Sequence, residues 1–471
     1  MMSKIFFLTI LWITKLNIWM IRLFKLGHAS NLPGKIALML NKNFIRFFSF
    51  ISNKKIILVT GTNGKSTTFG LAAVFLKTSG KTVLYNETGA NLRTGIASTF
   101  AKNSNLLGRL NIEYILLEID EATLPLITKD LAPDLIVVTN LFRDQLDRFG
   151  ELDTTLKLIE TGINNCNTTV LLNADDPRVA FINTKNKKYF FGFSEGFVQG
   201  NPYSNKGYPY SNQGYPQNGM TWLLDPEEAT ECPNCNSSLT ISNKVIAHLG
   251  SYKCNKCRLK KPVLDFEITS FQADNLSTNC DIKYNNQKHN FFLPFIGTFN
   301  LYNTLCAIAI SNLTANVTDV QIQKGLQLYS TIFGRFEKLS LENKSAWIYL
   351  IKNPTGTTEV LKTLSNLENA RFLIALNDNL ADGRDVSWIW DARFDFLKGH
   401  NKNIFVSGKR AYDMALRLKY ADIEPSKIVV DENITSAVKE AISNISKSET
   451  LYILPTYTVL LEMQRKGISK N

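Results

Sequence analysis

The sequence predicts an α/β protein with two mostly parallel sheets, and two observations lead to this prediction. β-rich runs alternate with helical stretches over residues 53–177, beginning with NKKIILVTGTNGKSTTFGLAAVFLKTSG. The same alternation restarts at about residue 340 with AWIYLI, RFLIAL, NIFVSG and LYILPT. Strands that alternate with helices are typical of parallel sheets whose faces the helices cover. We therefore expect two α/β domains, and 471 residues are enough for two or three domains.

The composition narrows the class of protein. Hydrophobic residues make up 44% of the chain, which is typical of a globular protein. The 53 Lys and Arg residues outnumber the 41 Asp and Glu residues and give a formal charge of +12. This charge favours anionic partners such as nucleotides, phospholipid surfaces or nucleic acids, without choosing among them. The 7 cysteines show no disulfide-like spacing, so we expect a cytoplasmic protein.

The first segment, residues 1–50, is expected to be helical and amphipathic. Its apolar run from Ile5 to Thr14 is too short to cross a bilayer before Lys15, and no signal-peptide cleavage site follows. On a helix, Lys4, Lys15 and Arg22 lie within about 20° of one another and form a narrow basic stripe. The helix could lie on a membrane surface. Alternatively, it could pack on the body of the protein with its cations outward.

A phosphate-binding loop follows the first predicted strand. GTNGKST (61–67) lies between the strand IILVT and a helix, where backbone N–H groups and the helix N-terminus favour phosphate. Lys65 can reach the β- and γ-phosphates, and the Ser66 hydroxyl can ligate Mg²⁺. Val59 replaces the first glycine of the usual P-loop pattern, but the strand–turn–helix setting keeps the signal specific. We predict ATP binding by the whole loop: Gly61, Thr62, Asn63, Gly64, Lys65, Ser66 and Thr67.

Acidic and amide side chains follow the next strands. Glu118, Asp120 and Glu121 end the strand LLEIDE. Asn140 and Asp144 lie in VVTNLFRDQLDRFGE (137–151), at the end of the next β-rich run, DLIVVTN. Ligands bind at the carboxyl ends of parallel strands. Carboxylates there could hold Mg²⁺ directly or through water, although each one alone is more typical of a cap or a surface charge.

Two insertions interrupt the first α/β domain. The tandem repeat YSNKGYP–YSNQGYP marks a flexible surface insertion over residues 195–220. CPNC and CNKC form a C-x₂-C-x₁₈-C-x₂-C pattern that predicts a zinc ribbon over residues 228–262. Four thiolates leave no open position, so the zinc is expected to be structural. A redox dithiol and a nucleic-acid-binding ribbon are the alternatives. The predicted zinc ligands are Cys232, Cys235, Cys254 and Cys257.

On these motifs the sequence resembles the Mur ligase superfamily, the ATP-dependent enzymes that join amino acids to peptidoglycan precursors. The resemblance implies a Mur-ligase-like central ATP-binding domain over residues 51–330 and a C-terminal Rossmann-like α/β domain over residues 331–471. It implies that Glu118 ligates Mg²⁺ with Ser66. The further ATP-binding residues that it implies are Asn300, Asn303, Arg335 and Lys352. The shared motifs are TGTNGKST, TNLFRDQLDRFGE, LLNADDP, GTFNLYNTLCA, FGR and KNP, in the right order along nearly the whole chain.

The chain also departs from the usual Mur pattern. Asp144-Gln145 stands where typical members have Asp-His, and LIKNPTG replaces an Asp-x-x-His-x-Pro stretch. No candidate is found for the modified lysine that helps many members bind Mg²⁺. The ribbon, RDQLDRFGE, KNPTG and the opening stretch instead resemble the MurT-type subunits of lipid II isoglutaminyl synthase.

The MurT-type resemblance implies a synthetase with a partner. Such a subunit uses ATP to convert the α-carboxylate of D-glutamate in the lipid II stem peptide to an amide, through an acyl phosphate. A separate class I glutaminase subunit supplies ammonia. The resemblance implies a cytoplasmic heterodimer, at the inner face of the plasma membrane if the first helix contacts lipid. Nucleic acid is not expected as a partner.

The segment LNDNLADGRDVSWIWD (376–391) acquires a role through this resemblance. In a glutaminase a cysteine attacks the amide, a histidine moves the proton and a third group orients the histidine. The resemblance implies that Asp385 is this third, catalytic group and acts on the partner's histidine. Trp388 and Trp390 are either interface anchors or core residues. The other aspartates are expected to serve turns and caps: Asp378, Asp382 and Asp391.

Two other functions remain in competition with the synthetase. One is an autonomous amino-acid ligase of the Mur or folylpolyglutamate type, against which the Cys₄ ribbon and ADGRDVSW count. The other is a zinc-ribbon nucleic-acid-binding protein that retains an ATP-binding fold, whose binding would be sensitive to salt.

Overall fold

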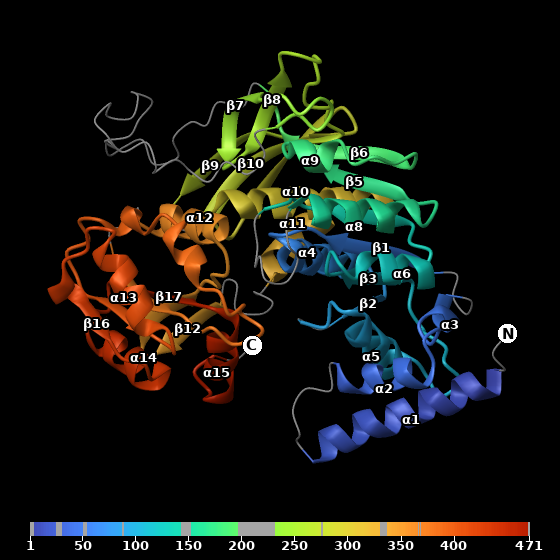
Figure 1. The fold of residues 1–471 in the computed structure, drawn as a ribbon, viewed down its shortest axis with the longest axis horizontal. Helices are drawn as coiled ribbons and strands as arrows, with labels where there is room; N and C mark the ends of the chain where they lie inside the picture. The colour runs from blue at the N-terminus through green and yellow to red at the C-terminus, as the bar shows by residue number, and fades with distance from the viewer. Residues whose placement is uncertain are drawn as a thin grey trace.

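The structure is a computed structural model, and two sheets organise the chain. One sheet has nine strands and the other six, and a two-stranded ribbon accompanies the first (Figure 1). The structure describes residues 4–24, 31–49, 54–86, 89–142, 152–195, 231–274, 277–329, 337–365, 367 and 369–469. The YSNxGYP repeat, Asp144, Gln145 and Arg335 lie outside the described residues.

The nine-stranded sheet is mixed rather than purely parallel. Its order is β11-β10-β9-β6-β5-β4-β1-β3-β2, and β9, β10 and β11 pair antiparallel while the other neighbours are parallel. The antiparallel edge arises because only two residues separate each of these strands from the next along the chain, whereas a parallel connection needs a crossover of about a dozen or more residues. The strands are β1 (Lys55–Thr60), β2 (Val83–Tyr85), β3 (Tyr114–Glu118), β4 (Leu135–Val138), β5 (Thr169–Asn173), β6 (Lys187–Phe193), β9 (Phe266–Asp274), β10 (Ser277–Tyr284) and β11 (Gln287–Leu293).

Helices cover both faces of this sheet, which explains the continuous apolar runs of its central strands. Along β1, Ile57 and Val59 belong to one core cluster, and Ile56 and Leu58 belong to the other. On the first face lie α4 (Lys65–Thr78), α10 (Thr298–Ala315) and α11 (Asp319–Leu328). On the second lie α5 (Arg93–Asn103), α6 (Leu124–Asp130), α8 (Leu152–Asn164) and α9 (Pro177–Ala180).

The N-terminal segment adds three helices. Helices α1 (Lys4–Leu23) and α2 (Leu32–Leu40) lie below α5 in Figure 1, and α3 (Arg46–Ser49) contacts α6. Gly34 lets α2 approach α5 closely, since a Cβ there would lie 1.9 Å from the Thr94 carbonyl oxygen. Helix α1 continues through Lys15, and the Lys15 ammonium donates to the carbonyls of Ala101 and Ser104 at the end of α5. The expectation that the cations face outward is therefore wrong for Lys15.

The six-stranded sheet carries the C-terminal part of the chain, in orange and red in Figure 1. Its order is β12-β13-β17-β14-β15-β16, and all neighbours except β12 and β13 are parallel. The strands are β12 (Glu337–Leu341), β13 (Lys344–Ile348), β14 (Ala370–Ala375), β15 (Ile404–Ser407), β16 (Ile428–Val430) and β17 (Thr450–Pro455). The helices are α12 (Pro354–Leu364) and α13 (Ala411–Lys419) on one face, and α14 (Ile434–Ser443) and α15 (Tyr457–Arg465) on the other.

The ribbon hairpin is formed by β7 (Leu239–Ile246) and β8 (Leu249–Cys254), which pair antiparallel. Three short 3₁₀ helices complete the described elements: η2 (Ser387–Trp390), η3 (Phe394–Leu397) and η4 (Pro425–Lys427). The predicted domain boundaries remain a prediction, and the junction near residue 330 falls among residues outside the described part of the chain.

Candidate active site

The phosphate loop joins β1 to α4, as the sequence predicts. Gly61 and Gly64 have φ values of +116° and +82°, which favour glycine. A Cβ at Gly61 would lie 2.4 Å from Thr139 Oγ1, and one at Gly64 would lie 2.1 Å from Asn303 Oδ1. These glycines therefore allow the loop backbone to lie directly against the end of β4 and against α10.

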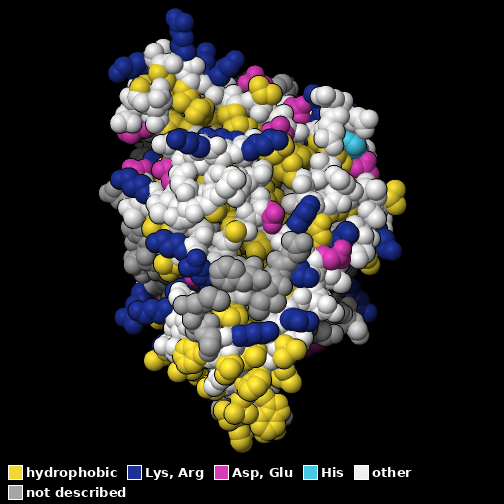
Figure 2. All heavy atoms as spheres, turned by 90° about the vertical axis from the view of Figure 1, so that its right-hand side faces the viewer, with side chains coloured by type: hydrophobic (Ala, Val, Ile, Leu, Met, Phe, Trp, Pro, Cys, Tyr) yellow, Lys and Arg dark blue, Asp and Glu magenta, His cyan; other side chains and the backbone are white. Residues whose placement is uncertain are grey.

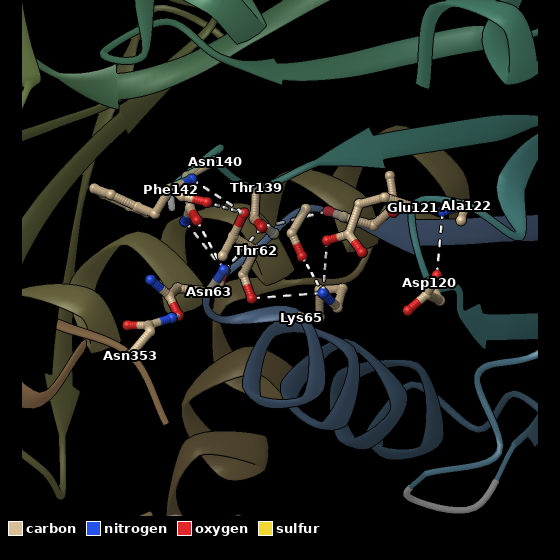
Figure 3. Close-up of polar contacts among 12 residues, drawn as sticks. Thr62, Asn63, Lys65, Asp120, Glu121, Ala122, Thr139, Asn140, Phe142 and Asn353 are labelled. Carbon is tan, nitrogen blue, oxygen red and sulfur yellow. Dashed lines mark hydrogen bonds and ion pairs between the residues drawn. The ribbon is translucent and has the colours of Figure 1, made fainter. Parts of the chain in front are cut away.

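Side chains that follow β4 hold the loop in shape (Figure 3). The Asn63 amide donates to Asn140 Oδ1 at 2.8 Å, and Thr139 Oγ1 donates to the Asn63 carbonyl at 2.8 Å. The Thr62 hydroxyl exchanges hydrogen bonds with the Phe142 backbone. The predicted clustering of loop and strand ends is thus confirmed for Asn140, whereas Thr139 was missed. Its signal was the position beside Asn140, directly after a buried strand.

Lys65 forms an ion pair with Glu121, which follows β3. Its ammonium donates to Glu121 Oε1 at 2.8 Å and also to the Gly61 carbonyl (Figure 3). Burial alone would lower the pKa of Lys65, but the attraction of Glu121, then of Glu118 and Asp120, raises it above its ordinary value. Burial raises the pKa of Glu121 despite the pull of Lys65. Lys65 therefore stays charged in a buried position, where a phosphate could replace the carboxylate as its partner.

The acidic cluster is buried but is not a preformed metal cage. Glu118, Asp120 and Glu121 have relative exposures of 8%, 7% and 5%. Asp120 Oδ1 accepts the Ala122 amide at 3.1 Å, which is a local turn. Within the described part of the chain, only the four cysteines bring three or more His, Cys, Asp or Glu ligand atoms together. Hard oxygen donors from Ser66 and Glu118 still suit Mg²⁺, which usually binds one or two carboxylates with substrate phosphates and water.

The C-terminal domain reaches the same loop. Lys352 Nζ donates to the Thr62 carbonyl at 3.2 Å, and Asn353 Nδ2 donates to Asn63 Oδ1 at 2.8 Å. Asn353 also caps α12, since its Oδ1 accepts the Gly356 amide at 2.8 Å. Lys352 is therefore close to the loop, as the resemblance implied, while the contact through Asn353 was missed.

The two asparagines of α10 differ in their relation to the loop. Asn303 is buried against Gly64, and its Oδ1 accepts the Thr68 hydroxyl at 3.3 Å. Asn300 instead turns its amide toward the Ile296 carbonyl at 2.6 Å. Of these two residues, only Asn303 thus touches the loop, and the ATP-binding roles implied for both remain predictions.

The four cysteines meet as the spacing predicts. The Cys232 and Cys257 sulfurs lie 3.4 Å apart and the Cys235 and Cys254 sulfurs 3.5 Å apart, with all four within 4.8 Å. A tetrahedral ion with Zn–S bonds of about 2.3 Å needs sulfurs about 3.8 Å apart, so the set fits Zn²⁺. Backbone and side-chain hydrogen bonds lower the pKa of Cys254 to about 6, which favours the thiolate that a metal requires.

A buried polar junction, which the sequence did not reveal, joins the ribbon to the sheet. Asp175, in the turn after β5, pairs with Lys261 and accepts the Tyr302 hydroxyl at 2.6 Å. The neighbouring Asp176 accepts the Leu141 amide at 2.8 Å, one residue beyond Asn140. The ribbon therefore rests on the same strand ends that shape the phosphate loop.

The loop after β14 presents Asp385 to solvent. Asp385 Oδ1 accepts the Ser387 amide at 2.8 Å, and this bond lowers the pKa of Asp385. Asp382 is buried and accepts the Thr458 amide at 2.8 Å at the start of α15, so its expected capping role is confirmed. Trp388 packs against the core, whereas Trp390 is 47% exposed and meets Tyr420 edge-on at 5.6 Å.

Comparisons with known proteins define the class first. The Mur ligase middle domain matches residues 59–215, and the MurT ligase C-terminal domain matches residues 350–460. MurF from Thermotoga maritima in complex with ADP has a similar fold, with a TM-score of 0.62 at 14% identity over 91% of this chain and 84% of that one. A pseudomurein peptide ligase type C from Methanothermus fervidus gives 0.60 at 20% identity over 88% and 79%. The fold is therefore that of the Mur ligases.

Curated relatives narrow the class to one family. MurT, the subunit of lipid II isoglutaminyl synthase (glutamine-hydrolyzing) from Streptococcus pneumoniae strain R6, is 35% identical over 93% of this chain and 92% of its own length. MurT from Staphylococcus aureus strain COL is 33% identical over 92% of both chains. The chain belongs to the MurT family of lipid II isoglutaminyl synthase subunits.

Proposed function

We propose that this chain is the ATP-dependent synthetase subunit of a glutamine amidotransferase that amidates lipid II. The observation that carries the proposal is the buried phosphate loop with its charged Lys65, in a chain that matches two MurT subunits over 92% of their length. The carboxylate amidated would be the α-carboxylate of D-glutamate in the stem peptide.

The chemistry follows from the poor reactivity of a carboxylate. A carboxylate oxygen attacks the γ-phosphorus of ATP, ADP leaves, and an acyl phosphate remains. Ammonia then attacks the acyl carbon, phosphate leaves with the electrons of the broken C–O bond, and the proton that the nitrogen loses passes to the phosphate. No nucleophilic side chain on this chain is needed, so its residues act by position and charge.

Each loop group has a proposed task in this reaction. Loop amides and the N-terminus of α4 would bind phosphate oxygens. Lys65 would exchange Glu121 for a phosphate, which suits a lysine that stays charged while buried. Lys352 would face the phosphates from the C-terminal side. When bound between Ser66 and Glu118, Mg²⁺ would offset phosphate charge.

The partner is proposed to be a class I glutaminase that docks near Asp385. An exposed carboxylate that remains ionised is suited to orient a histidine on another chain. Among the described residues, none of His248, His289 and His400 forms a hydrogen bond with a cysteine, as the histidine of a glutaminase would. The Cys₄ zinc is proposed to stabilise the ribbon, and the C-terminal sheet is proposed to be Rossmann-like. The heterodimer is proposed to work in the cytoplasm.

Reconstitution tests the proposal. The chain would be combined with a class I glutaminase from the same genome, lipid II, ATP, Mg²⁺ and glutamine, and the stem peptide would be analysed by mass spectrometry. We expect an amide in place of one carboxyl group and one ADP for each amide. Ligation of a free amino acid by the isolated chain, with no amidation by the pair, would contradict the proposal and favour an autonomous ligase.

A further inference from the structure

Helix α1 carries apolar side chains on both of its faces. Its buried face packs Phe7, Ile10 and Leu11 against the body of the protein. A helix that is hydrophobic all round is normally covered on every side. The outward face of α1 instead exposes large side chains over most of its length: Ile5 77%, Phe6 48%, Trp12 51%, Leu16 54%, Trp19 59% and Leu23 56%.

Neighbouring segments extend this apolar face. Leu32, Met39 and Leu40 of α2 are 56%, 76% and 47% exposed. Leu106 and Leu107, in the loop after α5, are 67% and 52% exposed. We call these side chains, with the outward face of α1, the tip surface. Figure 2 shows hydrophobic side chains gathered at the lower end of the molecule, where Figure 1 places α1 and α2.

The tip surface is clamped along the body of the protein. Trp12 Nε1 donates to the Leu106 carbonyl at 2.8 Å, and the Lys15 ammonium donates to the Ala101 carbonyl at 2.7 Å. The Phe7 ring stacks on the Phe47 ring at 3.9 Å. By length and composition alone, Lys4–Ile21 could cross a membrane, but crossing would break these contacts. These contacts therefore hold α1 lengthwise along the body of the protein and leave its outward apolar face exposed to solvent.

The charge of the segment indicates what covers that face. The chain has no Asp or Glu before Glu87. Exposed cations adjoin the tip surface at Lys4 and Lys35, and at Arg109 beside Leu107. The first 50 residues contain seven basic side chains: Lys4, Lys15, Arg22, Lys25, Lys35, Lys42 and Arg46. An apolar face with tryptophans and adjoining cations complements a bilayer with anionic headgroups.

We propose that the tip surface binds the surface of an anionic lipid bilayer, with α1 lying in the plane of the membrane. Apolar side chains would enter the headgroup–acyl boundary, and the lysines and arginines would meet lipid phosphates. The advantage to the enzyme rests on the proposed function, since lipid II is held in a membrane. The binding itself does not depend on that function.

Vesicle flotation tests the proposal with the full chain. The vesicles contain phosphatidylglycerol and phosphatidylcholine, or phosphatidylcholine alone, and no lipid II. We expect the chain to float with the anionic vesicles, tryptophan emission to shift to shorter wavelength, and binding to weaken as salt is raised. Failure to bind anionic vesicles at low salt would overturn the proposal. So would retention after an alkaline carbonate wash, since that outcome means that α1 crosses the bilayer.

A matched pair of triple variants locates the binding face. Leu16→Gln, Trp19→Gln and Met39→Gln together remove three side chains of the tip surface, and binding should weaken about a hundredfold or more. Val263→Gln, Val320→Gln and Leu328→Gln change side chains that are 90%, 79% and 58% exposed elsewhere, and binding should not change. Equal binding by the two variants would overturn the proposal. So would a wild-type dimer that only the tip variant dissociates, with no vesicle binding, because the occupant would then be a second copy.

Amidation assays separate this proposal from the proposed function. With the glutaminase partner, the tip variant should amidate detergent-solubilised lipid II at the wild-type rate and lose activity on lipid II embedded in vesicles. Vesicle binding without amidation in either setting would contradict the proposed function and leave the membrane surface standing. Equal activity of the tip variant in detergent and on vesicles would overturn the inference that this surface delivers the enzyme to its substrate.

Discussion

Two loops of this molecule each follow a strand of one of the two sheets, and they place their charged side chains differently. Residues 61–67 follow β1 of the nine-stranded sheet, and residues 376–391 follow β14 of the six-stranded sheet. In the first loop Lys65 is buried and paired with Glu121 within the chain. In the second, Asp385 is exposed, and its Oδ1 accepts a hydrogen bond from the backbone amide of its near neighbour Ser387. The charge of the phosphate loop is thus paired within this chain, whereas the charge of the Asp385 loop faces solvent.

Electrostatics explains why the two arrangements differ. A buried charge needs a partner, because removing it from water costs several kcal/mol. Lys65 and Glu121 pair with each other. In the proposed reaction, a phosphate would replace Glu121 as the partner of Lys65. An exposed carboxylate has no such cost and can remain ionised until a second protein covers it. The pKa shifts agree, since burial raises the pKa of Glu121 and the Ser387 amide lowers that of Asp385.

The largest expected effect comes from the buried charge of the phosphate loop. Lys65→Met should lower amidation by about 10³-fold or more with either glutamine or ammonium salt as the donor, because the phosphate charge loses its cation. Release of ADP measures the effect. Lys55→Met is the control, since Lys55 lies at the opposite end of β1 and donates to the Thr314 carbonyl. A loss restricted to glutamine would contradict the assignment of Lys65 to the synthetase site.

The second-largest expected effect is on stability and comes from the junction beneath the ribbon, which also holds a buried charge. Lys261→Met leaves Asp175 buried without its cation, which should lower the free energy of unfolding by about 3–5 kcal/mol. Thermal or urea unfolding measures this change. Lys283→Met breaks a pair with Glu267 in which the lysine is 49% exposed, and should cost below about 1 kcal/mol. Equal losses in the two variants would mean that the junction is not a buried ion pair in solution.

A change at Asp385 should lower amidation with only one of the two nitrogen donors, glutamine. With the glutaminase present, Asp385→Asn should lower glutamine-driven amidation about a hundredfold, because the partner's histidine loses its orienting charge. Amidation driven by ammonium salt should remain within about twofold, since the synthetase site is untouched. Asp391→Asn, an exposed aspartate of the same loop, is the control. Wild-type activity with glutamine would remove Asp385 from catalysis.

The smallest expected effect is on stability and has a defined pH dependence. The pKa of Asp385 is lower in the folded chain than its usual value of 3.8, so its carboxylate stabilises the fold above that pH. The contribution disappears as pH falls through the folded-state pKa. Because the group is exposed, Asp385→Asn should lower the free energy of unfolding by less than about 1 kcal/mol at neutral pH. Unfolding curves of the wild-type protein and the Asp385→Asn variant should therefore converge in strong acid. A difference in the free energy of unfolding that grows as the pH falls would contradict the predicted direction.

Much of the site could be predicted because its signals are local. The phosphate loop, the Cys₄ set and the clustering of strand ends each depend on spacing within a short stretch of chain or on a general property of parallel sheets. The basic stripe of the first helix was misinterpreted for the opposite reason. A helical projection gives the angle of Lys15 but not the carbonyls at the end of α5 that accept its hydrogen bonds.

The sequence by itself determined the α/β class, the phosphate loop, the four-thiolate set and the family, because short motifs set local backbone geometry and ligand spacing. Only the tertiary structure decided which groups meet. Glu121 reaches Lys65 across 56 positions, and Asn353 reaches Asn63 across 290. It also decided which face of α1 is buried, because apolar side chains lie on both faces beside the basic stripe and do not distinguish the buried face. Burial depends on the shape of the neighbouring helices, and that shape is a property of the whole fold.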